Sequence, residues 1–173
     1  MILFDKNGNC GTFFEYKASR YEIFKEKMKA DMGKQTDEDV REILRKAIVG
    51  GALHGKCVVF DLGKVSGKIL ATQSSQPNVW PADKIFNFQE WRKEENHMPL
   101  VREDENKSIL GSQGAYSMNK HLFTIIILAD YESEEKCQEL LNIIPHSANM
   151  IKKFIEWKIL ISNPNIFHWK IVG

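Results

Sequence analysis

The sequence predicts an α/β domain built on a parallel sheet, and three observations lead to this expectation. Three short stretches, at residues 1–4, 57–60 and 121–130, contain apolar runs that are too continuous for strands that expose one face to water. Amphipathic helical patterns separate these runs, and strands that alternate with helices form parallel sheets through right-handed crossovers. The 173 residues, 43% of them apolar, suffice for a single domain spanning 1–173 with its own core.

The first apolar run ends abruptly at Asp5 and leads into a loop of turn-forming residues. Residues 5–11 contain two glycines and two asparagines, which tolerate the backbone angles of tight turns. A short helix is expected to follow over residues 12–16. A strand, a loop and a helix in this order form the setting in which backbone amides face a bound phosphate.

The clearest helix is predicted to begin at Thr36, whose hydroxyl is suited to cap the amide of Asp39. Apolar side chains three and four positions apart then form one stripe, at Val40, Ile43, Leu44, Ala47 and Ile48. This helix has two alternative C-terminal ends, one at Gly50-Gly51 and one at Gly55. We favour Gly55, because apolar residues continue between these glycines.

The second apolar run closes on Asp61 and is predicted to be a buried strand. Residues 63–119 have no strong periodicity and many polar residues. We therefore expect a polar insertion with short helices, part of it mobile.

The third apolar run is predicted to be a buried strand, followed by an amphipathic helix over residues 132–143. Ser147 is expected to cap a further helix. Its predicted apolar stripe comprises Ile151, Phe154 and Ile155. The tail at 166–172 alternates weakly between apolar and polar residues, which is typical of an edge strand.

Charge and composition exclude several classes of function. With 24 basic and 23 acidic residues the net charge is +1, which argues against a nucleic-acid-binding domain. The longest apolar run has about eight residues, whereas a membrane span needs about 20. Three separate cysteines, Cys10, Cys57 and Cys137, favour a reducing, cytoplasmic compartment and buried, unreactive thiols. The five histidines form no pair with metal-ligand spacing, so we expect no metal and no cofactor.

Two segments compare with the phosphate-loop pattern G-x-x-x-x-G-K-[ST]. Residues 50–57, Gly-Gly-Ala-Leu-His-Gly-Lys-Cys, contain both glycines and the lysine, but a predicted helix precedes them and a strand follows. We interpret this segment as the end of a helix. Residues 5–12 have the right setting but lack the lysine. Here Asp5 and Cys10 replace the two glycines, Gly11 replaces the lysine, and Thr12 keeps the hydroxyl.

A phosphate-loop hydrolase is disfavoured by further residues. Asp61 ends an apolar strand, as does the aspartate that positions magnesium in such enzymes, but Leu62 stands where a water-activating glutamate is needed. The alternative is a nucleotide-binding switch or weak ATPase with a degenerate phosphate loop. Its candidate ATP or ADP contacts are Gly8, Gly11, Thr12 and Asp61.

Residues 1–10, Met-Ile-Leu-Phe-Asp-Lys-Asn-Gly-Asn-Cys, resemble the first strand and degenerate loop of the fifth AAA+ module of dynein heavy chains. That module has an apolar strand and then Asp-Pro-Gln-Gly-Gln-Ala. A closer likeness is to the dynein-like C-terminal region of IQ-motif and ankyrin-repeat-containing proteins, where a Gly-Lys pair leads to Val-Phe-Asp-Leu, here residues 59–62. The resemblance covers residues 1–62 and, more weakly, 120–145. Lys6 departs from the dynein proline, and neither an ankyrin repeat nor an IQ motif occurs.

The resemblance implies an AAA+-like, P-loop NTPase-type parallel sheet with flanking helices, minimal or truncated, in which the first apolar strand lies beside the third. A different strand order is expected if the chain is unrelated to AAA+ proteins. A chain that begins at its first strand is also what a piece of a larger protein would look like.

The resemblance also implies a catalytically inactive, structural component of a microtubule-based assembly in the cytoskeleton of a cilium or axoneme. Its expected partners are proteins, with no nucleic acid and no membrane. Trp157, Phe167 and Trp169 lie near lysines in the tail and are candidates for docking such a partner. Ordinary packing of these aromatic residues is the equally weighted alternative.

Overall fold

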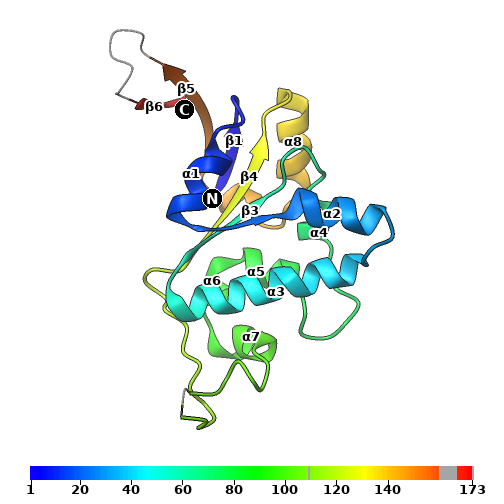
Figure 1. Ribbon diagram of the computed structural model, residues 1–173, viewed down its shortest axis with the longest axis vertical. Helices are drawn as coiled ribbons and strands as arrows, with labels where there is room; N and C mark the ends of the chain where they lie inside the picture. Colours follow the sequence, from blue (N-terminus) through cyan, green and yellow to red (C-terminus); the bar gives the residue numbers. More distant parts are fainter. Residues whose placement is uncertain (109, 160–166, 173) are drawn as a thin grey trace.

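The computed structural model describes residues 1–108, 110–159 and 167–172, the segments 157–159 and 167–172 by their backbone alone. Six strands form one sheet in the order β2-β3-β4-β1-β5-β6 (Figure 1). The strands are β1 (Ile2–Asp5), β2 (Ser19–Glu22), β3 (Cys57–Asp61), β4 (Thr124–Asp130), β5 (Lys152–Ile159) and β6 (Phe167–Val172). All neighbouring pairs are parallel except β5 and β6, so an antiparallel edge strand completes a five-stranded parallel sheet.

The parallel pairing of β1 with β4 on one side and β5 on the other confirms the predicted fold class. Leu3 in β1 lies opposite Leu128 in β4 on one side and Lys153 in β5 on the other. The first apolar strand is thus beside the third, as expected of a P-loop-like α/β fold.

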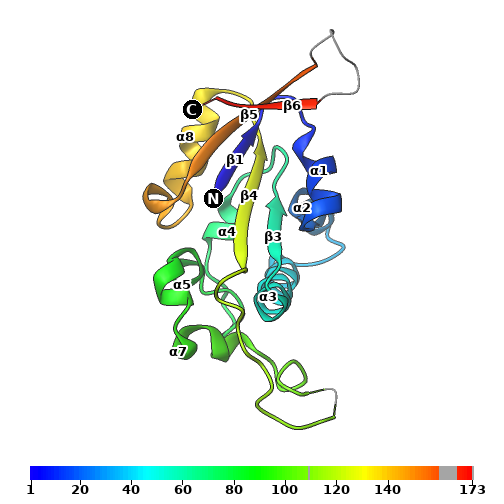
Figure 2. The same cartoon turned by 90° about the vertical axis from the view of Figure 1, so that its left-hand side faces the viewer.

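Helices cover the sheet and fill the connections between its strands. They are α1 (Cys10–Lys17), α2 (Ile23–Asp31), α3 (Asp37–His54), α4 (Lys68–Ala71), α5 (Ala82–Phe86), α6 (Phe88–Trp91), α7 (Glu94–His97) and α8 (Glu134–Ile143), with 3-10 turns η1 (Met98–Leu100) and η2 (Ser147–Asn149). Helices α1 and α8 lie on opposite sides of the sheet (Figure 2). In the described parts of the chain, none of these helices combines the length and apolarity required to cross a bilayer.

Helix α3 begins and ends as predicted. Thr36 accepts a hydrogen bond from the amide of Asp39, and the Asp39 side chain accepts one from the amide of Thr36, which together form a capping box. Gly55 has φ +62° and supplies the left-handed C-cap. Gly50 and Gly51 therefore lie inside the helix, and the segment 50–57 is a helix end that leads into β3.

The two faces of the sheet belong to two apolar clusters. On the smaller one, Leu3 packs with Cys10 and Phe14 of α1. The larger cluster includes Phe4 of β1 and extends through α3, α8 and the segment 63–119. Alternate residues of β1 thus enter different clusters, as expected for a strand buried on both faces.

The insertion at 63–119 contains the predicted short helices and packs firmly against α3. Trp80 is fully buried, and its indole N–H donates to the carbonyl of Leu70 at 2.7 Å. Arg45, also buried, donates from Nη1 to the carbonyl of Leu100 at 2.6 Å and to Glu105 at 2.7 Å. A buried arginine of α3 therefore anchors the chain that follows η1.

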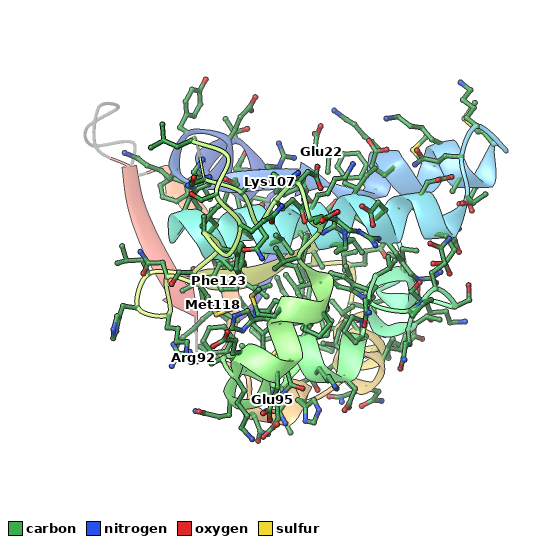
Figure 3. The ribbon with its side chains drawn as sticks, turned by 90° about the horizontal axis from the view of Figure 1, so that it is seen from below. Glu22, Arg92, Glu95, Lys107, Met118 and Phe123 are labelled. Carbon is green, nitrogen blue, oxygen red and sulfur yellow. The ribbon has the colours of Figure 1, made fainter. Side chains whose placement is uncertain are left out.

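A second contact joins the insertion to the start of β4. Phe88 stacks on Phe123 with ring centroids 6.4 Å apart, and the guanidinium of Arg92 lies 4.4 Å from the centre of the Phe88 ring. Arg92 also donates to the carbonyl of Lys120 at 3.0 Å, and Figure 3 labels Arg92, Met118 and Phe123 where the insertion returns to the sheet. Met118 and Phe123 are both buried.

The helix predicted after Ser147 is wrong, because this segment forms the short turn η2 and then β5. Phe154 stacks on Phe4 at 5.1 Å in the larger cluster, whereas Ile155 packs with Leu3 in the smaller one. Adjacent residues that face opposite sides are a strand pattern. Ile151, the first residue of the predicted stripe, is exposed.

Candidate functional site

The carboxyl ends of β1, β3 and β4 meet at a cavity of about 420 Å³. Each strand ends in an aspartate, Asp5, Asp61 and Asp130 respectively, and all three line the cavity. Ligands of open parallel sheets bind outside the carboxyl ends of the strands. This cavity is therefore the candidate site.

Asp5 folds the loop after β1 around its own carboxylate. Oδ1 accepts hydrogen bonds from the amides of Asn7 and Gly8, both at 3.0 Å, and Oδ2 accepts one from the amide of Cys10 at 2.6 Å. Asp5 is 3% exposed, so water competes little for these bonds. Three of the loop amides that could face a phosphate therefore already bind this carboxylate.

Arg20 of β2 performs the corresponding role for Asp61. Its Nε and Nη2 donate to Asp61 Oδ2 at 2.9 and 2.5 Å, while the amide of Gly63 donates to Oδ1 at 2.9 Å. A Cβ atom on Gly11 would lie only 2.7 Å from Arg20 Nη2. The glycine at position 11 therefore leaves room for the guanidinium, and both oxygens of Asp61 are already engaged.

Asp130 completes the group of three acids without a comparable partner. No hydrogen bond or ion pair reaches its carboxylate from the described residues. Burial raises the pKa of Asp130, and the negative charges of Asp61 and Asp5 raise it further, while Lys64 opposes this shift. The same negative charges disfavour a polyphosphate in this cavity.

The structure places the predicted nucleotide contacts unequally. Gly8, Gly11 and Asp61 line the cavity together, whereas Thr12 is exposed on α1 and is not part of the lining. Leu62 is fully buried in the larger apolar cluster. Position 62 therefore offers no group to activate water.

Sequence reasoning missed Arg20, Lys64 and Asp130 as residues of this site. Arg20 lies in a strand that no apolar run signals, and Lys64 lies in the loop after β3. Asp130 ends an apolar run in the same way as Asp5 and Asp61, and this shared pattern was the available signal.

The candidate partner-binding residues Trp157, Phe167 and Trp169 have side chains outside the described part of the structure. Their backbones belong to β5 and β6, in which Trp157 pairs with Trp169 across the antiparallel edge.

The thiols show no sign of a reactive role. Cys10 and Cys137 are buried and Cys57 is half-buried, and no disulfide joins these three cysteines. Burial raises the pKa of Cys137, which makes its thiolate scarcer. Among the residues with described positions, no three His, Cys, Asp or Glu side chains are arranged to hold a metal ion.

The carboxyl-end cavity is P-loop-like in its position and unlike a nucleotide site in its charges. The Asp5 carboxylate accepts hydrogen bonds from loop amides, and the Arg20 guanidinium donates to Asp61. No family model, no curated protein and no solved structure matches the chain.

Proposed function

We propose that this chain is a catalytically inactive AAA+-like domain that serves as a structural or interaction component of a microtubule-based, ciliary or axonemal assembly. The observation that carries the inactive character is the engagement of Asp61 by Arg20, with Arg20 Nη2 2.5 Å from Asp61 Oδ2. A P-loop hydrolase needs this aspartate to hold magnesium beside the phosphates. Here a fixed cation of the chain already neutralises it.

Two further features support the absence of hydrolysis. The loop has Gly11 in place of the lysine that pairs with the β- and γ-phosphates, and the buried Leu62 replaces the glutamate that activates water. The Asp5 carboxylate on the loop amides repels a phosphate that approaches the same donors.

The proposed setting depends on the resemblance of residues 1–62 to dynein-type modules. The net charge of +1 favours attachment through protein partners over direct binding of a basic patch to the acidic microtubule lattice. We accordingly propose protein partners in a cytoplasmic, cytoskeletal assembly.

The alternative function is a nucleotide-binding switch or weak ATPase. It is favoured by the cavity of about 420 Å³ beside Gly8, Gly11 and Asp61, with Lys64 as a second cation. Bound nucleotide stabilises a folded protein by mass action, so the two functions differ in thermal unfolding.

Two experiments test the proposal. We expect millimolar ATP or ADP with magnesium to leave the midpoint of thermal unfolding unchanged. A rise in the midpoint that Asp61→Ala abolishes, and that the exposed control Asp104→Asn retains, would establish the alternative instead. Independently, we expect the protein to co-sediment with axonemal or microtubule preparations, and failure to find any stable partner there would contradict the interaction role.

A further inference from the structure

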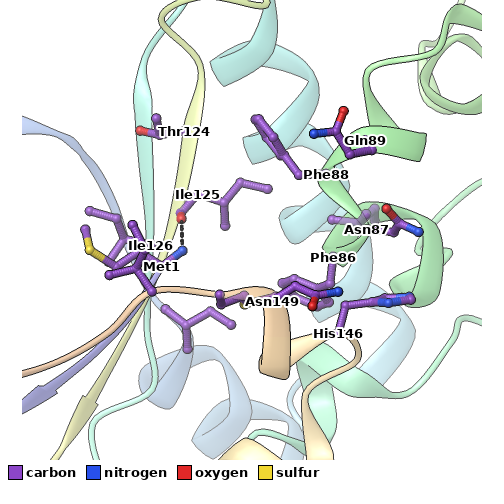
Figure 4. A pocket seen from close by; sticks show the side chains of 14 residues that line it. Met1, Phe86, Asn87, Phe88, Gln89, Thr124, Ile125, Ile126, His146 and Asn149 are labelled. Atoms are coloured by element: carbon purple, nitrogen blue, oxygen red, sulfur yellow. Dashed lines mark hydrogen bonds between the residues drawn. The ribbon is translucent and has the colours of Figure 1, made fainter.

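A second cavity, of about 590 Å³, lies at the opposite end of the sheet from the three aspartates. Its floor is the first half of β4, from Thr124 to Ile127, and its walls are the α5–α6 segment, residues 146–151 and Met1 (Figure 4). Ligand sites of proteins commonly measure about 300–1,000 Å³ and are mainly apolar. The cavity has the size of a small-molecule site.

The only ionisable side chain in the described lining is His146, which faces Asp83. The 14 lining residues include no Asp, Glu, Lys or Arg, although such residues make up 27% of the chain. The α-amino group of Met1 is beside the cavity, but it donates to the carbonyl of Ile125 at 3.0 Å, and burial lowers its pKa (Figure 4). An ionic ligand would lose its hydration without gaining a charged side chain as partner.

Fixed contacts hold the walls in place without a ligand. His146 Nε2 and Asp83 Oδ1 lie 3.0 Å apart and link the wall at 146–151 to α5. His146 has φ +56°, a backbone conformation that is costly for a residue with a side chain and that recurs at ligand-binding positions. On the other wall, Phe88 is held between Arg92 and Phe123.

We propose that this cavity binds a neutral, mainly apolar small molecule. The apolar part packs on Ile125, Ile127 and Phe86, and a polar group of the ligand hydrogen-bonds the side-chain amide of either Gln89 or Asn149, which are both exposed. Ile151 lies at the mouth with 62% of its surface exposed, and such a ligand would cover it. This site is independent of the proposed inactive nucleotide site.

The test uses N-phenyl-1-naphthylamine, a neutral apolar dye whose fluorescence rises on burial. We expect saturable binding of one dye per protein. Ile151→Glu places a charge at the mouth and should weaken binding about tenfold or more, because the carboxylate loses hydration beside the bound dye.

The matched control is Leu122→Glu, because Leu122 is 64% exposed and does not line the cavity. This variant should bind the dye as the unmodified protein does. The proposal is overturned if the unmodified protein shows no saturable binding, or if both glutamate variants bind it equally. Self-association that Ile151→Glu abolishes, without dye binding, would also overturn it and would assign this surface to a second copy of the chain.

Discussion

Each of the three strand-end aspartates has a different environment, and Asp130 has the least favourable one. Asp5 receives three backbone amides, and Asp61 receives a guanidinium and an amide. Asp130 lies near the negative charges of Asp5 and Asp61, and no described donor reaches its carboxylate. Its ionised form therefore opposes folding.

We expect Asp130→Asn to stabilise the protein at pH 7. The pKa of Asp130 is raised in the folded state, so the folded protein binds more protons than the unfolded chain as the pH rises from about 4 through the raised value. Stability is thus lost as the pH rises across this interval. The amide variant cannot ionise, and its free energy of unfolding should exceed that of the unmodified protein at pH 7 and approach it at pH 3.

Urea unfolding at both pH values provides the measurement. Asp104 is exposed, so Asp104→Asn is the control. The free energy of unfolding of this variant should equal that of the unmodified protein at both pH values. A gain for Asp130→Asn that persisted at pH 3 would contradict the electrostatic cause.

At the scale of the element, α3 contains two adjacent glycines with opposite surroundings. A Cβ atom on Gly50 would have no atom within 4 Å, whereas one on Gly51 would lie 2.3 Å from Cγ2 of Val58 in β3. Gly51 therefore permits the close approach of α3 to the sheet, and Gly50 only weakens the helix.

We expect opposite effects from the two alanine substitutions. Gly50→Ala should stabilise the protein by about 0.5–1 kcal/mol, because alanine restricts the unfolded chain and favours the helix. Gly51→Ala should destabilise it by about 1–3 kcal/mol, because the methyl group overpacks the contact with β3. Denaturant unfolding of the two variants measures both values, and equal effects would refute the proposed close packing.

The elements also show which patterns a sequence reveals. Helix α3 and strands β1, β3 and β4 follow from capping residues and continuous apolar runs, which are local signals. Strand β2, with the sequence Ser-Arg-Tyr-Glu, has no such run, because it pairs on one side only and its residues are half-buried. At β5, the spacing of Ile151, Phe154 and Ile155 fits one face of a helix, and only the pairing with β1 selects the strand.

In the molecule as a whole, two arginines pair with the same glutamate, and they differ in how deeply their side chains are buried. Arg45 has a side chain that is 1% exposed and pairs with Glu42 and Glu105. Arg102 also pairs with Glu42, at 3.3 Å, but its side chain is 45% exposed. Arg45 thus joins α3 to the insertion inside the protein, whereas the side chain of Arg102 is largely in contact with solvent.

Arg45→Ala should therefore lower the free energy of unfolding by about 1–3 kcal/mol, because it leaves the buried carbonyl of Leu100 unpaired and removes the partner of the partly buried Glu105. Arg102→Ala, the matched control, should change it by at most about 1 kcal/mol. Chemical denaturation compares the two. Similar effects would show that burial of Arg45 contributes nothing to the attachment of the insertion.

The site could be predicted from the sequence only where local signals exist. Asp5 and Asp61 end apolar runs, so their meeting at one edge of a parallel sheet follows from the fold class. The contact of Arg20 with Asp61 depends on the pairing of β2 with β3, which no local pattern encodes. The apolar cavity likewise needs four segments that are separated in the sequence.

The interior position of β1 in the sheet has a consequence for the order in which the molecule assembles. Ile2 pairs with Ile127 in β4 and with Lys152 in β5, so β1 is synthesised well before either of its two neighbours. Pairings between such distant residues close slowly. On the ribosome, the apolar residues of β1 therefore stay unpaired until β4 has been synthesised. A chaperone can bind this strand during that interval.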